Sequence, residues 1–207
     1  MRKIQIARHQ LGTSLALFIE NMDPISVHCL ACSAGEVIES ISNHENIDVF
    51  TNKLIRQNPG LDIKEFRKIR SKYWNAFKHA TSKNKNLLRN DESLLKGFSD
   101  KINDSILLLA WTDYSSYTKK LPIEAQVFQT WFYALNEEKL DPKVDKAPYR
   151  NIFPEIKNKT RIEQKIILKK ACIAFKDAGI NKEDEDEDED DIEIKTEPDP
   201  LIYPCDL

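Results

Sequence analysis

Glycine is scarce in this chain, and that scarcity limits the available folds more than any other sequence feature. Only 5 of the 207 residues are glycine, and long stretches contain neither glycine nor proline. Turn-rich β-sandwiches and glycine-loop nucleotide-binding folds both need glycine where the backbone turns sharply or approaches a phosphate. Apolar residues instead recur at helical spacing, as in Ile4, Ala7, Leu11, Leu15 and Phe18. The sequence therefore predicts an all-α protein.

Helix start signals divide the chain into six or seven predicted helices. A polar side chain before a helix can accept the first free backbone N–H groups, and proline fits the first turn, where no donor is lost. Such signals, two of them capping boxes, are Asp23-Pro24, Asp62 with Glu65, and Thr160 with Glu163. Residues 81–90 and the proline-containing stretch 140–159 are predicted to be irregular. The predicted helices are residues 3–20, 24–41, 48–57, 62–80, 100–119, 122–135 and 160–178.

The charge is divided unevenly along the chain. Residues 181–207 contain 13 acidic residues and 2 lysines, a net charge of −11, and since the whole chain carries −3, residues 1–180 carry +8. Nine consecutive acidic residues, 183–191, repel one another and cannot form a core, so we expect disorder there. Beyond them, Leu201-Ile202-Tyr203-Pro204 is an apolar patch that can dock on the body or on a partner. We predict one helical domain over 1–180 and an acidic tail over 181–207.

Composition and hydropathy exclude several classes of protein. Hydrophobic residues make up 41% of the chain and charged residues 31%, which is typical of a globular protein with a polar surface. No apolar run reaches the roughly 18 residues of a transmembrane helix, so no membrane partner is expected. The basic N-terminus has the pattern of an amphipathic helix and not of a signal peptide. We expect a cytoplasmic protein with reduced cysteines and with neither a metal nor a cofactor.

The predicted helix 62–80 has two distinct faces. The face expected to point to the core carries Phe66, Ile69, Tyr73, Phe77 and Ala80. The opposite stripe carries Lys68, Lys72, Asn75 and His79. Lysine attracts phosphate, an amide orients a neighbour, and imidazole transfers protons near neutral pH, so the stripe has the groups of an anion-binding or acid/base site. The competing interpretation is a solvated polar face that ends in a capping histidine.

A second histidine, His28, lies on the predicted buried helix 24–41. It faces a stripe of small residues, where another helix can approach closely enough to bring His79 within reach. One interpretation is therefore a His28/His79 pair across two helices. The other is a buried histidine hydrogen-bonded to a backbone carbonyl or to Ser26.

Cys29 and Cys32 form a C-x-x-C motif next to that histidine. Zinc sites of this spacing usually lie in loops and need a second ligand pair, and thioredoxin-type chemistry needs a preceding strand. Because neither feature is predicted here, we interpret the pair as two small hydrophobic side chains on a buried helix.

The predicted helix 160–178 is also amphipathic. Its cations Arg161, Lys165, Lys169 and Lys170 lie opposite Ile162, Ile166, Ile167, Ile173 and Phe175. We expect the cations to form a basic outer face, which contacts phosphates or is simply solvated. A third interpretation is that the acidic tail folds back onto this face and competes with nucleic acid.

Two segments carry a resemblance to a known family. Residues 23–30, Asp-Pro-Ile-Ser-Val-His-Cys-Leu, and 75–80, Asn-Ala-Phe-Lys-His-Ala, are similar to the D-P-x-S-V-H-x-L and N-F-F-K-H-A motifs of a family of small, uncharacterised bacterial helical proteins. Residues 121–134, with Trp131-Phe132, are similar to a later stretch of that family. The likeness covers roughly residues 5–138 and leaves the acidic tail outside.

The chain also resembles, more loosely, the HEPN domains, which are helical bundles, often dimeric, and often ribonucleases of toxin or phage-defence systems. Their active motif places an arginine and then a polar residue before a catalytic histidine, and Asn75 and His79 match the last two elements. Trp74 stands in place of the arginine, and Arg70 is too far upstream. The resemblance thus implies a helical module, with a homodimer among its expected states, and the missing arginine argues against ribonuclease activity.

Functions of different classes follow from these features. The leading hypothesis is an HEPN-like module that binds RNA, another nucleic acid or a partner protein, because the body is basic and the motif arginine is missing. The alternative is a metal-independent ribonuclease. Its parts would be His79 as acid/base, Asn75 as orienting group, Lys78 or Lys72 as phosphate clamp, and His28 as a further group. A third hypothesis, a scaffold or secreted effector, rests on the acidic C-terminal stretch alone.

Overall fold

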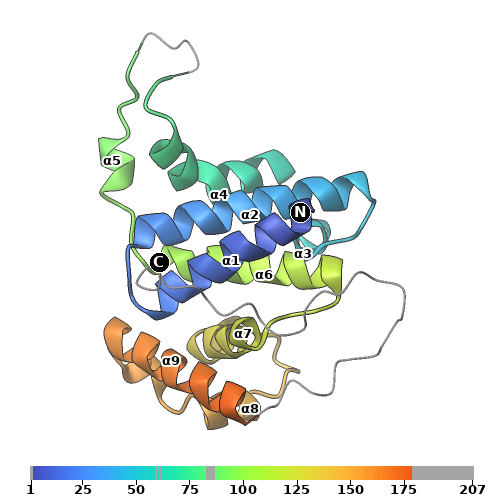
Figure 1. The fold of residues 1–207 in the computed structure, drawn as a ribbon, viewed down its shortest axis with the longest axis vertical. Helices are drawn as coiled ribbons and strands as arrows, with labels where there is room; N and C mark the ends of the chain where they lie inside the picture. Colours follow the sequence, from blue (N-terminus) through green and yellow to red (C-terminus); the bar gives the residue numbers. More distant parts are fainter. Residues whose placement is uncertain (1, 59, 61, 83–86, 179–207) are drawn as a thin grey trace. The chain divides into compact units, whose positions relative to one another are not determined.

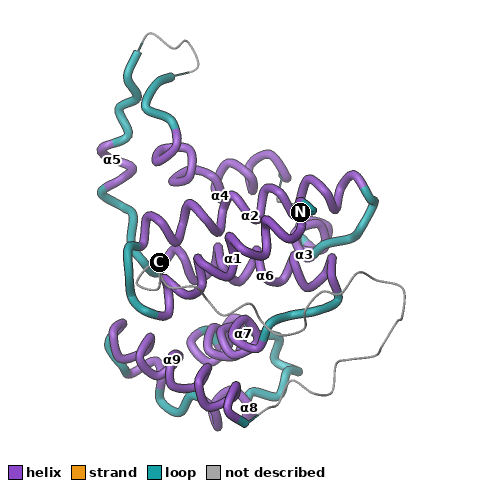
Figure 2. Tube along the Cα trace, in the orientation of Figure 1, coloured by secondary structure: helices purple, strands orange, loops and turns teal. Residues whose placement is uncertain are grey.

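The computed structural model describes residues 2–58, 60, 62–82 and 87–178, and the predicted tail 181–207 lies outside them. Every regular element in this described part is a helix, so the all-α prediction is confirmed (Figure 1, Figure 2). The helices of eight or more residues are α1 (Lys3–Ile19), α2 (Pro24–His44), α3 (Phe50–Gln57), α4 (Ile63–Lys78), α6 (Ile102–Thr118), α7 (Ile123–Leu135) and α9 (Arg161–Asp177). The shorter ones are α5 (Glu92–Leu95), η1 (Glu137–Lys139), α8 (Ala147–Ile152) and η2 (Ile156–Asn158).

Two of the three predicted helix starts are formed by the expected contacts. At α4 the Asp62 carboxylate accepts the Lys64 N–H at 3.2 Å, and the predicted capping box with Glu65 is not formed. The Asp23 carboxylate accepts the Ser26 backbone N–H at 2.9 Å, with Pro24 in the first turn of α2. Thr160 and Glu163 complete a capping box before α9, in which the Thr160 N–H donates to the Glu163 carboxylate at 2.7 Å. These starts need only residues within one turn of each other, which is why the sequence alone reveals them.

Helix α3 is capped from another part of the chain. Val49, its N-cap residue, has no side-chain oxygen, and the Thr51 N–H donates instead to the Asp113 carboxylate of α6 at 2.9 Å. The Thr51 hydroxyl donates to the same carboxylate at 2.6 Å. Burial raises the pKa of Asp113, although these hydrogen bonds oppose the shift. Asp113 therefore anchors α3 to α6 across 62 residues of sequence.

The two stretches predicted to be irregular contain short ordered elements. Residues 140–159 include α8, where Pro148 lies in the first helical turn, so this proline begins a helix instead of preventing one. The described part of 81–90 has an isolated antiparallel bridge between Thr81 and Leu88. Leu87 and Leu88 are both exposed there.

The helices group into two compact units, which we describe separately. The first unit comprises residues up to Ser14 together with Asp23–Lys119, and the second comprises Leu15–Met22 and the chain from Lys120 onward. None of the helices in the described residues is long and apolar enough to span a bilayer.

In the first unit α2 lies between α4 and α6 (Figure 1). Its side toward α6 carries small residues, and Ala110 Cβ of α6 lies only 3.7 Å from where a Cβ on Gly35 would be. Such an approach of a second helix is the one predicted from the stripe of small residues on helix 24–41. The larger side chains of the core include Leu11, Ile38, Leu107 and Trp111.

The core of the second unit is built on aromatic rings. Phe18 packs edge-on against Phe128 and Trp131, with ring centroids 5.5 and 5.8 Å away. The Trp131 indole N–H donates to the backbone carbonyl of Gln164 at 3.1 Å, which ties α7 to α9. Phe153, Ile156 and Leu168 close this core.

Candidate functional site

Helix α4 carries the predicted stripe, and a buried carboxylate on α2 orients the helix. Glu39 is almost fully buried and accepts hydrogen bonds from Arg67 Nε at 2.7 Å and from Arg70. Burial by itself raises the pKa of Glu39, but the two guanidinium groups outweigh burial and hold the pKa below its ordinary value. Two of the cations on α4 are therefore neutralised on its inner side.

An aromatic cluster completes the inner side of α4. Tyr73 and Phe77 lie edge-on to the His28 ring, with centroids 6.1 and 5.8 Å away. Phe98, from the segment after α5, approaches His28 to 5.4 Å and Phe77 to 5.0 Å. The rings of Tyr73, Phe77 and Phe98 thus surround His28 and form an aromatic cage.

The predicted core face of α4 is wrong at two of its five residues. Ile69 is 57% exposed, and Ala80 lies beyond the helix end and is also exposed. Tyr73 is buried, whereas Phe66 and Phe77 are half-buried. The cause is the pairing of Arg67 and Arg70 with Glu39, which turns an arginine-containing face inward and rotates Ile69 away from the core.

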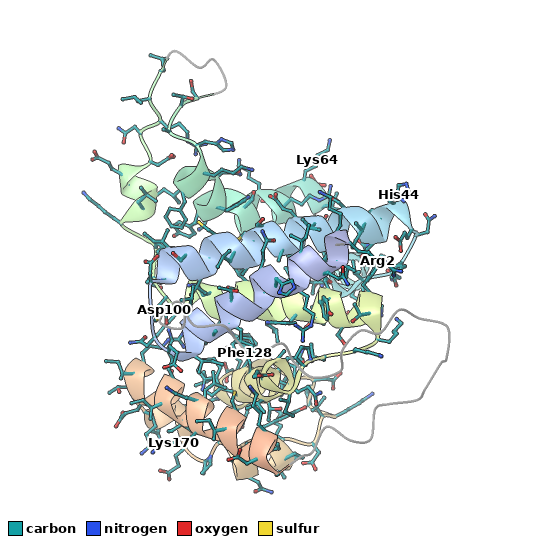
Figure 3. The ribbon with its side chains drawn as sticks, viewed as in Figure 1. Arg2, His44, Lys64, Asp100, Phe128 and Lys170 are labelled. Carbon is teal, nitrogen blue, oxygen red and sulfur yellow. The ribbon has the colours of Figure 1, made fainter. Side chains whose placement is uncertain are left out.

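The opposite face of α4 is basic and exposed. Lys64, Lys68 and Lys72 follow one another at intervals of four residues, all are exposed, and Figure 3 shows Lys64 pointing away from the helix. Among the described residues no carboxylate pairs with any of the three. The Lys72 ammonium lies 4.7 Å from the centroid of the Tyr73 ring. The lysines of the predicted stripe therefore face solvent.

Lys78 and Trp74 form a small group near the end of α4. The Lys78 ammonium lies 5.0 Å from the centroid of the Trp74 ring. The Trp74 indole N–H donates to the Glu36 carboxylate of α2 at 3.0 Å. Trp74 is therefore held against α2 and covered by a lysine, and its ring is not an open stacking platform.

Asn75 and His79 are neighbours in the backbone, but their side chains are not joined. The His79 N–H donates to the Asn75 carbonyl at 3.1 Å, and His79 is the exposed C-cap residue with an extended backbone. The half-buried Asn75 amide instead donates to the Ser71 hydroxyl at 3.1 Å. In this structure the amide does not orient the imidazole.

His28 is fully buried, and its partner is a residue that the sequence analysis missed. His28 Nδ1 lies 2.9 Å from Asn103 Oδ1, while Asn103 Nδ2 donates to the Pro24 carbonyl at 2.9 Å. Because that second bond places the Asn103 oxygen toward His28, the imidazole must donate from Nδ1. Burial lowers the pKa of His28, so the ring is neutral. Asn103 was missed because an asparagine in a first helical turn resembles an ordinary capping residue.

The structure does not bring His28 and His79 together. The ring neighbours of His28 are Tyr73, Phe77 and Phe98, its hydrogen-bond partner is Asn103, and His79 is exposed. A surface cavity of about 290 Å³ in the same unit is lined by polar residues around the end of α2, among them Ser42, Asn46 and Asp48. None of the predicted catalytic residues lines that cavity.

Cys29 and Cys32 are free thiols on α2. Burial raises the pKa of Cys32 to about 12 and also raises that of Cys29. Thiols with raised pKa values are poor nucleophiles, which agrees with their interpretation as small hydrophobic side chains. Within the described ranges, no group of three or more His, Cys, Asp or Glu side chains is arranged to hold a metal ion.

In the second unit, the predicted basic outer face of α9 is wrong at two of its four cations, Arg161 and Lys165, whereas Lys169 and Lys170 are exposed as predicted. Lys165 is 1% exposed, and its ammonium lies 4.2 Å from the centroid of the Phe18 ring. The half-buried Arg161 guanidinium lies 5.1 Å from the same ring. Lys169 is exposed and pairs with Glu20 at 2.7 Å. Three isoleucines, Ile162, Ile166 and Ile173, are exposed beside these lysines.

No protein-family model matches this chain, and no curated protein or solved structure matches it either. A functional proposal therefore rests on the geometry within each of the two units.

Proposed function

We propose that the protein is a helical nucleic-acid-binding module that contacts the phosphate backbone through Lys64, Lys68 and Lys72 of α4. The observation that carries the proposal is that cations on one side of this helix have a carboxylate partner and those on the other side do not. The inner arginines pair with Glu39, whereas the outer lysines have no carboxylate partner among the described residues. The +8 charge of residues 1–180 adds a general attraction for polyanions.

The spacing of the lysines suits a phosphate backbone. Residues four apart on an α-helix are separated by about 6 Å along its axis, so the three ammonium groups follow a line about 12 Å long. Phosphate contacts of this kind position a protein on nucleic acid without reading its sequence. Trp74, which a hydrogen bond to Glu36 holds against α2 and which the Lys78 ammonium covers, offers no open face for a base to stack on. The proposal is therefore backbone binding with little base specificity.

The test compares two triple variants of the full-length protein. Lys64→Ala/Lys68→Ala/Lys72→Ala removes the row, and Lys53→Ala/Lys96→Ala/Lys101→Ala removes three other exposed lysines of the same unit. Each phosphate contact contributes about 0.9 to the slope of log K against log salt for duplex DNA and about 0.7 for single strands. We expect the row variant to lower the slope by about 2–3 and the control variant to lower it by less than about 1.

Three results would overturn the proposal. Equal slopes for the two variants would show that only net charge matters. The absence of salt-sensitive binding to both RNA and DNA would favour a protein partner, the other half of the leading hypothesis. A slope unchanged by removal of the row would exclude α4 as the contact surface.

The ribonuclease alternative has less support from the geometry. It needs Asn75 to orient His79, but Asn75 bonds to Ser71 and His79 is an exposed cap residue. The loose HEPN resemblance, with Trp74 in place of the motif arginine, belongs to the proposal of a binding module. RNA cleavage is followed on the samples used for binding. Cleavage by the unsubstituted protein that is lost in His79→Ala would show that the protein is an enzyme and not only a binding module.

A further inference from the structure

Helix α9 presents an apolar stripe on its outer side. Ile162, Ile166 and Ile173 are 59%, 48% and 50% exposed, and at 100° per residue they lie within a 40° arc of the helix. A different side of α9, with Lys165, Leu168 and Cys172, is buried. The isoleucines therefore contribute little to the core of their own unit, and an exposed apolar stripe of this kind is typical of a docking surface.

We propose that this stripe is the docking site for the chain's own C-terminal segment Leu201-Ile202-Tyr203. The inference is independent of nucleic-acid binding by α4. The segment belongs to residues 179–207, outside those that the structure describes, and its sequence, length and position carry the argument.

The size of the stripe favours a short segment over a second copy of the chain. A stable dimer interface buries about 20–30 residues on each side. Three isoleucines on one helix are far fewer, and a short apolar segment is enough to cover part of such a stripe. Tyr203 adds a ring with large contact area, and the flanking Pro200 and Pro204 restrict the backbone, which lowers the entropy lost on docking.

The tail contains a second apolar pair, Ile192 and Ile194, which fits the stripe less well. Asp191 precedes Ile192, and Glu193 separates the two isoleucines, so docking them would bring carboxylates toward an apolar surface. Residues 200–204 contain no charged side chain. This contrast makes the pair a matched control within the same tail.

The connection between helix and segment is long enough and has the complementary charge. A linker of 22 residues separates Ala178 from Leu201 and can extend to roughly 75 Å, whereas α9 is only about 25 Å long. Tethering gives an effective concentration on the order of millimolar, so weak contacts suffice. Lys170 lies on one flank of the stripe, where it attracts the acidic run 183–191 of the linker (Figure 3 labels Lys170), while Lys169 on the other flank pairs with Glu20.

The test uses full-length protein with 13C-labelled isoleucine methyl groups, assigned through single Ile→Val variants. Leu201→Ser/Ile202→Ser should shift the methyl signals of Ile162, Ile166 and Ile173, whereas Ile192→Ser/Ile194→Ser should leave them in place. Conversely, Ile162→Ser/Ile166→Ser/Ile173→Ser should shift the Ile202 methyl signal. This triple variant should still fold, because the substituted side chains are about half exposed.

Every other outcome contradicts the proposal. Unchanged methyl signals in Leu201→Ser/Ile202→Ser would mean that the segment does not dock on α9. Equal shifts in the two tail variants would assign the contact to the linker and not to residues 201–203. Shifts that depend on protein concentration would identify the occupant as a second copy of the chain.

Discussion

Helices α4 and α9 have similar compositions but bury different kinds of side chain. Each has 16 or 17 residues and combines cationic with apolar side chains at helical spacing. In α4 the lysines face solvent and the aromatic residues face the core of the first unit. In α9 a lysine is buried and isoleucines are exposed. The comparison shows that composition and periodicity identify an amphipathic helix without determining which side is buried.

What each helix packs against explains the difference. The α2 surface under α4 offers the Glu39 carboxylate, which takes two arginines, and aromatic contacts for Tyr73 and Phe77. The core under α9 offers the Phe18 and Trp131 rings, whose faces attract cations. A lysine has a long apolar stem, so it can be buried where such a ring receives its charge.

The largest expected effect comes from breaking the ion pairs that hold α4 against α2. Glu39→Gln removes the charge that pairs with Arg67 and Arg70. Loss of one partner from a buried ion pair costs about 3–5 kcal/mol, and because Arg67 is 45% exposed we expect a loss near the lower limit. Urea denaturation should show this loss in the free energy of unfolding. Glu65→Gln, on the same helix but exposed, is the control and should change stability by less than about 0.5 kcal/mol. Equal values for the two variants would mean that Glu39 does not hold α4.

The second prediction tests the reversed orientation of α9. Lys165→Ala removes a buried stem packed on Phe18 and should cost about 2 kcal/mol, whereas Ile166→Ala should cost less than about 1 kcal/mol. Thermal or urea unfolding of the two variants measures the difference. If the isoleucine variant lost more stability than the lysine variant, α9 would be oriented as the sequence pattern predicts.

The third prediction concerns pH and the aromatic cage beneath α4. Because burial lowers the pKa of His28, the unfolded chain binds a proton at higher pH than the native protein does. The contribution of His28 is therefore fully present above its unfolded pKa of about 6.5 and is lost as pH falls toward the folded pKa, by up to about 1.4 kcal/mol per pH unit.

Stability measured between pH 7.5 and 5 checks this sign. His28→Gln keeps a side-chain donor for Asn103 and should flatten the slope, while His79→Gln, at an exposed position, should leave it unchanged. A slope in His28→Gln as steep as in the unsubstituted protein would assign the acid sensitivity to other groups.

The smallest expected effect tests which side chains of α4 face the core. Ile69 lies on the predicted core face but is exposed, so Ile69→Ser should change the free energy of unfolding by less than about 0.5 kcal/mol. Tyr73→Ser, at the buried position one turn later, should cost several times more. Comparable losses in the free energy of unfolding at the two positions would indicate that Ile69 is part of the core.

Much of the candidate site follows from sequence, because its parts are local. Lys68 and Lys72 were predicted to share one side of the helix, and the same interval of four residues places Lys64, which the prediction left out, on that side too. The environment of His28 was not predictable in the same way. Its partner Asn103 is 75 residues away, and its aromatic neighbours come from α4 and from the segment after α5.

The sequence by itself determined where the seven longer helices lie and that the protein is all-α, because caps, prolines and apolar periodicity act within a few residues of one another. Only the tertiary structure decided which face of each helix is buried. That choice depends on the carboxylates, rings and carbonyl groups that a distant part of the chain presents. Glu39 turns arginines of α4 inward, and Phe18 accepts Lys165 of α9. Long cationic side chains tolerate either environment, so their own pattern carries no information about the partner they will meet.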